Sequence, residues 1–125
     1  MDFNFRYSTE TTKEELQKKL EEIMNASGLD YTISWSHSGD PFLTERKDLL
    51  NACLSSVKDE LDMTAEISTD GGTSDGRFMA KICDQVIEFG LINESIHKIN
   101  EHTTKSDLDA VTKVYKSMLK RLLSR

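Results

Sequence analysis

The sequence predicts an α/β protein, because two hydrophobic periodicities alternate along the chain. Apolar and polar residues alternate over residues 3–7 and 31–35, which is typical of strands with one buried face. Apolar residues recur at helical spacing over residues 16–24, 50–61 and 108–122. The 125 residues and 14.2 kDa fit one compact unit and are too few for most two-domain enzymes.

The first part of the chain, residues 3–36, has the pattern of a β-α-β unit. Its two strands are the alternating segments named above, and the first is rich in aromatic residues. Between them, Thr12 with Glu15 fits a capping box, in which each side chain satisfies a free backbone N–H at a helix start. Gly28 is expected to end this helix, because glycine best adopts a left-handed backbone conformation.

A turn separates this unit from the rest of the chain. Gly39 and Pro41 lie within three residues of each other, and we place a domain boundary near residue 37. The elements expected beyond it are a helix over residues 50–61, strands over 65–68 and 86–89, a short helix over 78–83, and a last helix starting with Ser106 and Asp109.

Charge and composition exclude several classes of protein. The 16 basic and 22 acidic residues give a net charge of −6, which argues against a nucleic-acid-binding protein. No apolar run is long enough to span a membrane, and the first residues lack the basic and apolar segments of a signal peptide. The two cysteines, Cys53 and Cys83, are isolated, so we expect a reducing, cytoplasmic location.

The loop over residues 71–77 is the segment with the clearest potential for ligand binding. Glycines and small polar residues follow a predicted strand there, so the backbone can approach a ligand and offer N–H groups to an anion. It is not a Walker loop, because no lysine follows Gly76. The alternative is an ordinary connecting turn.

Single side chains leave both a functional and a structural interpretation open. The imidazole of His97 is a potential metal ligand, although lone histidines are more often structural or exposed. Arg6 could grip a carboxylate through two hydrogen bonds, or be a solvated residue that protects a strand edge. Ser38 is a turn hydroxyl, and Cys53 lies on an apolar helix face that favours a core position over a nucleophile.

Five segments, taken in order, resemble the succinyl-diaminopimelate desuccinylases, which belong to the di-zinc aminoacylase/carboxypeptidase-like metallopeptidase family. The resemblance extends over essentially the whole chain and is strongest around the glycine-rich loop. The segments are Phe3–Ser8, Trp35–Thr44, Ile67–Phe78, Val86–Gly90 and Ser95–Glu101. His37 and His102 depart from the family pattern, which usually has an apolar residue and a cysteine at these positions.

The resemblance implies only the C-terminal third of a larger enzyme. Residues 1–37 would be the last β-α-β unit of a lid or dimerisation domain, and residues 38–125 the C-terminal portion of an α/β catalytic domain. The implied activity is zinc-dependent hydrolysis of N-succinyl-L,L-2,6-diaminoheptanedioate to succinate and L,L-diaminopimelate, for lysine and peptidoglycan precursor synthesis. The competing hypothesis is a non-catalytic module, from a truncated or split gene, that assembles with itself or with a partner.

The resemblance also implies roles for individual residues. His97 would be a ligand of one of two zinc ions, for which cobalt is an alternative metal, and no catalytic base is expected in this chain. Arg6, Ser38, Gly72 and Thr73 would contact substrate carboxylates. The expected partners are a small-molecule substrate and either a second copy of the chain or the missing upstream portion, with neither nucleic acid nor a membrane.

Overall fold

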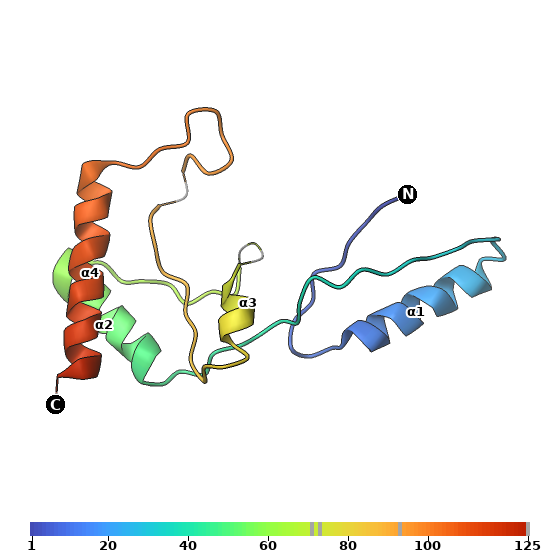
Figure 1. Cartoon of the computed structure of the whole chain (residues 1–125), viewed down its shortest axis with the longest axis horizontal. Coiled ribbons are helices and arrows are strands. Elements are labelled where there is room, and N and C mark those ends of the chain that lie inside the picture. The colour runs from blue at the N-terminus through green and yellow to red at the C-terminus, as the bar shows by residue number, and fades with distance from the viewer. Residues whose placement is uncertain (71, 73, 93, 125) are drawn as a thin grey trace. The chain divides into compact units, whose positions relative to one another are not determined.

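The computed structural model contains four helices in the described part of the chain, which is residues 1–125 without 71, 73, 93 and 125 (Figure 1). The chain divides into two units, Met1–Leu43 and Thr44–Arg125. The helices are α1 (Lys13–Ala26), α2 (Asp48–Leu61), α3 (Gly76–Met79) and α4 (Lys105–Leu123). The assignment of residues 1–37 and 38–125 to two domains of a larger enzyme stays a prediction.

The predicted β-α-β unit and the other predicted strands are wrong for this structure. Residues 3–7, 31–35, 65–68 and 86–89 form no strand in the part of the chain that is described. A strand requires a neighbouring strand to receive its backbone hydrogen bonds, and a favourable alternation of side chains does not supply that neighbour. Only the strand predictions fail in this way, because helices are present in the regions where the sequence predicts them.

Side chains fix one of these extended segments to α1 in the first unit. The Tyr31 hydroxyl donates to Asn25 Oδ1 over 3.0 Å, and Trp35 Nε1 donates to Glu21 Oε1 over 3.1 Å. Helix α1 itself begins at the predicted capping box, and Gly28 just beyond its end has a positive φ of 68°. The apolar side of α1 nevertheless contains no fully buried residue.

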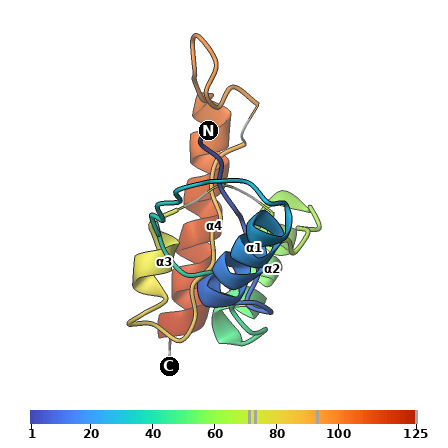
Figure 2. The same ribbon diagram turned by 90° about the vertical axis from the view of Figure 1, so that its right-hand side faces the viewer.

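The core of the second unit lies between α2 and α4, which run side by side (Figures 1 and 2). Cys53 and Val57 from α2 meet Val114 and Met118 from α4, and each of these side chains is at most 5% exposed. The core position predicted for Cys53 is therefore confirmed. Five partly buried residues pack around this cluster: Leu49, Leu61, Ala65, Ile87 and Phe89.

Residues 86–89 are held against this helix pair by side chains. Thr44 Oγ1 donates to the Val86 carbonyl and accepts from the Val86 N–H over 2.9 Å. At the other end of the segment, the Tyr115 hydroxyl donates to the Phe89 carbonyl over 2.5 Å. Backbone groups that a strand would pair with another strand are thus satisfied by side chains from α4 and from the segment before α2.

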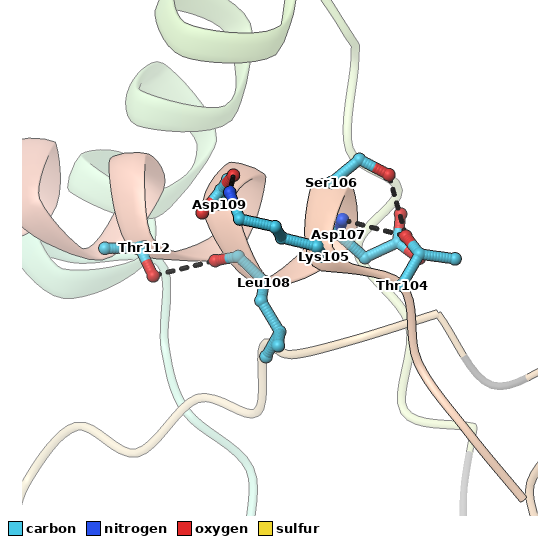
Figure 3. A network of polar contacts seen from close by, with 7 residues as sticks. All are labelled: Thr104, Lys105, Ser106, Asp107, Leu108, Asp109 and Thr112. Carbon is cyan, nitrogen blue, oxygen red and sulfur yellow. Dashed lines mark hydrogen bonds and ion pairs between the residues drawn. The ribbon is translucent and has the colours of Figure 1, made fainter.

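Two predicted helix boundaries also need correction. The short helix covers Gly76–Met79 instead of residues 78–83. The last helix is capped by Thr104, whose side chain accepts from the Asp107 N–H over 3.1 Å, and not by Ser106 (Figure 3). No helix among the described residues combines the length and the apolar character needed to cross a lipid bilayer.

Candidate functional site

Arg6 and Ser38, the two candidate carboxylate contacts of the first unit, are both exposed. Their chain neighbours contact each other: the Tyr7 hydroxyl lies 3.1 Å from His37 Nε2. The same nitrogen lies 3.3 Å from Asp40 Oδ1. Partial burial raises the pKa of the Tyr7 hydroxyl above its ordinary value, and the nearby charge of Asp40 acts in the same direction.

The glycine-rich loop is only partly described. Gly71 and the predicted site residue Thr73 lie outside the described residues. Gly72 is exposed, and a Cβ atom added to it would meet no atom within 4 Å, so no close backbone contact requires a glycine there. Ser74 orders the end of the loop, because its hydroxyl accepts from the Gly76 N–H over 3.0 Å and donates to Glu88.

His97 lies on the loop before α4, which extends beyond the first turn of that helix in both views (Figures 1 and 2). The imidazole is exposed, and the backbone has a positive φ of 60°, an unusual conformation for a residue other than glycine. The loop is closed at its base by Ser95, whose hydroxyl donates to the His102 carbonyl over 2.7 Å and accepts from the His102 N–H over 3.0 Å. His97 lies inside the turn that the Lys98 N–H closes by donating to the Ser95 carbonyl over 3.1 Å.

A zinc ion fits this chain only in part. The described residues contain no group of three or more histidine, cysteine or carboxylate side chains that would hold a metal ion. His97 therefore offers one accessible imidazole, whereas a zinc site needs at least three protein ligands. The cysteines add nothing, because Cys53 is buried, its pKa is raised by that burial, and Cys83 is an isolated exposed thiol.

The described candidate residues fall in two groups. Arg6 and Ser38 belong to the first unit, and their chain neighbours Tyr7 and His37 are in contact. Gly72 and His97 belong to the second unit, and no hydrogen bond joins them among the described residues. The cluster of Tyr7, His37 and Asp40 was not predicted from the sequence, in which its only local signal is the three-residue spacing of His37 and Asp40.

A second feature that the sequence did not reveal is an apolar groove beside the core of the second unit. Its volume is about 280 Å³. It is lined by Leu49, Met79, Cys83, Gln85, Val86, Ile87, Phe89, Tyr115 and Met118. Large apolar side chains near it are also exposed, among them Ile82 at 77% and Met79 at 46%. Exposed apolar surface of this kind favours association with another polypeptide.

Comparison with known proteins gives these features a context. Residues 4–121 match the peptidase family M20/M25/M40. The chain is 50% identical over 124 residues to the succinyl-diaminopimelate desuccinylase of Ralstonia pickettii and 52% identical over 122 residues to that of Burkholderia ambifaria. These alignments cover 99% and 98% of this chain but only 32% of each relative, so the chain spans about a third of the length of the curated relatives it matches. The chain belongs to the peptidase family M20/M25/M40.

Proposed function

We propose that this chain supplies part of the active site of a zinc-dependent amide hydrolase. The substrate would be N-succinyl-L,L-2,6-diaminoheptanedioate, cleaved to succinate and L,L-diaminopimelate for lysine and peptidoglycan precursor synthesis in the cytoplasm. The observation that carries the proposal is about 50% identity to named desuccinylases along nearly the whole chain.

The chain's own contribution is to bind the substrate and to offer one metal ligand. Arg6 presents a planar guanidinium that pairs with a carboxylate through two parallel hydrogen bonds, and the Ser38 hydroxyl adds a further donor. Gly72 and Thr73 would bring backbone and hydroxyl donors to a second carboxylate. His97 would donate an imidazole nitrogen to zinc, and its strained backbone is a reason to assign it a function. Zinc, when bound, supplies Lewis-acid polarisation of the amide carbonyl.

This proposal predicts that the 125-residue chain does not turn over substrate alone, because one imidazole does not complete a zinc site. The remaining ligands and the catalytic base would come from residues corresponding to the two thirds of the relatives that this chain does not match. The exposed apolar groove favours association with such a polypeptide or with a second copy of the chain. A purely non-catalytic, self-assembling module remains the second candidate, favoured by the same groove.

The test is hydrolysis of the succinylated substrate by the chain alone and after reconstitution with a polypeptide covering the unmatched two thirds. We expect activity only in the reconstituted assembly, and loss of it in the His97→Ala variant. His102→Asn is the matched control, because an asparagine side chain keeps a donor near the Asn100 carbonyl that His102 Nδ1 contacts over 2.7 Å. Full activity of His97→Ala would remove the metal-ligand role, and an inactive assembly would favour the non-catalytic module.

Substrate binding has its own test. Arg6→Lys should raise the KM of the assembly at least tenfold, because a charge-assisted hydrogen bond is worth about 1.5–3 kcal/mol and lysine cannot grip a carboxylate through two parallel bonds. An unchanged KM would show that Arg6 does not contact the substrate.

A further inference from the structure

The cluster of Tyr7, His37 and Asp40 connects the two ends of the first unit. Tyr7 and His37 are 30 residues apart in the sequence, and helix α1 lies between them. His37 Nε2 is within hydrogen-bonding distance of both partners, 3.1 Å from the Tyr7 hydroxyl and 3.3 Å from Asp40 Oδ1. One ring nitrogen therefore links the segment before α1 to the extended segment that precedes Pro41.

The chemistry of the three groups limits which hydrogen bonds each of them can make. A carboxylate only accepts hydrogen bonds, so the contact with Asp40 is favourable when His37 Nε2 carries a proton. Nε2 carries at most one proton, so with that proton in place Asp40 and the Tyr7 hydroxyl share one N–H donor; with an unprotonated Nε2 the Tyr7 hydroxyl donates to the ring instead. The charged side chains around Tyr7 are Asp40, Glu14 and Lys13. The contact between His37 and Asp40 is thus an ordinary hydrogen bond when the ring is neutral with its proton on Nε2. It is an ion pair when the ring is a charged imidazolium.

The position of this cluster matters because each candidate carboxylate contact is the next residue along the chain. Arg6 precedes Tyr7, and Ser38 follows His37. Consecutive Cα atoms across a trans peptide are about 3.8 Å apart, so fixing Tyr7 against His37 also limits how far Arg6 can move from Ser38. We propose that His37 is a positioning residue, which holds Arg6 and Ser38 close enough to bind one carboxylate group together.

This inference rests on the carboxylate-binding roles proposed above for Arg6 and Ser38. It differs from a stability role, because the side chains of His37 and Asp40 are 32% and 64% exposed. Ion pairs this open to solvent contribute little to folding free energy. Loss of the His37 contact should therefore change carboxylate binding and leave the helices intact.

The experiment uses the isotope-labelled 125-residue chain, with succinate as the probe, followed by NMR at the Ser38 amide and the Arg6 side-chain Nε–H. We expect succinate to shift both signals in the unsubstituted chain. His37→Leu should weaken succinate binding about tenfold and remove nuclear Overhauser contacts between residues 6–7 and 37–38. His37→Gln retains a side-chain N–H donor and should restore binding to within about threefold. Ser36→Ala, an exposed neighbour, is the matched control and should bind normally.

The outcomes separate this inference from the proposal beneath it. If Arg6→Lys weakens succinate binding but His37→Leu does not, the carboxylate role stands and the positioning role is overturned. If the unsubstituted chain shows no response to succinate, the role of Arg6 and Ser38 fails, and the positioning role fails with it. If His37→Gln binds as poorly as His37→Leu, the hydrogen bond is not what positions the pair, and the inference is also overturned.

Discussion

Helices α1 and α2 are both 14 residues long and both have one apolar side, yet they are stabilised in opposite ways. Helix α1 buries none of its residues, whereas α2 buries Ala52, Cys53, Ser56 and Val57. Helix α1 has a complete capping box, whereas the N-cap of α2, Lys47, makes no side-chain capping hydrogen bond. Local hydrogen bonds are thus enough to define where a helix begins, whereas a helix buries side chains only when another element packs against it, as α4 does against α2.

The first turn of α1 is satisfied by its own neighbours. Glu15 Oε2 accepts from the Thr12 N–H over 3.0 Å and from the Thr11 hydroxyl over 2.9 Å, while Thr12 Oγ1 accepts from the Glu15 N–H over 3.2 Å. The first turn of α2 depends instead on a distant residue, because the Leu49 N–H donates to Gln85 Oε1 over 3.0 Å. The start of α2 is therefore stabilised by a tertiary contact.

The largest expected effect follows from the difference in burial. Met118→Ala should destabilise the second unit by about 2–5 kcal/mol, because it opens a cavity against Cys53 and Val57. Ile23→Ala on α1 is the matched control, and its effect should stay within about 0.5 kcal/mol, because Ile23 is 58% exposed. The change in unfolding free energy of each variant is measured by urea unfolding, with amide hydrogen exchange as the readout. If the two variants were destabilised equally, Ile23 of α1 would be buried in solution, and the contrast in burial between α1 and α2 would be wrong.

A smaller effect is expected from the cap. Thr12→Ala should cost α1 about 1 kcal/mol, because it leaves a first-turn N–H without its acceptor. Since α1 has no buried residue to compensate, its helical ¹³Cα shifts over residues 13–18 should fall towards random-coil values. Lys47→Ala at the corresponding position of α2 is the control and should leave the α2 shifts unchanged. Retention of the α1 shifts would mean that packing, and not the cap, holds this helix.

Ser56 tests the cost of a polar group inside the packed helix pair. It is fully buried, and its hydroxyl has no hydrogen-bond partner among the described residues. Ser56→Ala should raise the stability of the second unit by about 1 kcal/mol, because an unsatisfied buried hydroxyl is removed. Ser55→Ala, exposed on the same helix, corrects for the higher helix propensity of alanine. If Ser56→Ala gains no more than Ser55→Ala in thermal unfolding, the hydroxyl is satisfied in solution.

The same contrast explains what the sequence could predict. The capping box of α1 spans four residues and was predicted residue for residue. The cap of α4 was misplaced because two overlapping matches exist, Thr104 with Asp107 and Ser106 with Asp109, and the two hydroxyls lie 2.7 Å apart. The hydrogen bond between Gln85 and Leu49 of α2 joins residues 36 positions apart in the sequence, so no local sequence pattern predicts it.

The predicted strands failed for a related reason. Alternation describes the two faces of an extended segment, but whether another strand lies beside it is a property of the tertiary structure. The candidate site residues were predicted by resemblance and not by physics, because Arg6, Ser38 and His97 are single exposed side chains with no local pattern of their own. Their roles stay predictions, whereas membership of the peptidase family is confirmed.

The smallest expected effect is a pH dependence confined to α1. The Thr12 backbone hydrogen bond, followed by that of the Thr11 side chain, holds the pKa of the Glu15 carboxyl below its ordinary value. Because the folded-state pKa is the lower one, the stabilisation is fully present above the ordinary pKa of glutamate and is lost as the pH falls through the lowered pKa. Acidification should therefore reduce the helical ¹³Cα shifts of α1 while those of α2, which lacks such a cap, stay constant over the same range. Glu15→Gln should remove this pH dependence, since a glutamine side chain accepts the same hydrogen bonds without titrating. If α1 in the glutamine variant still loses helicity over that pH range, another group is responsible and the capping box does not explain the difference between the two helices.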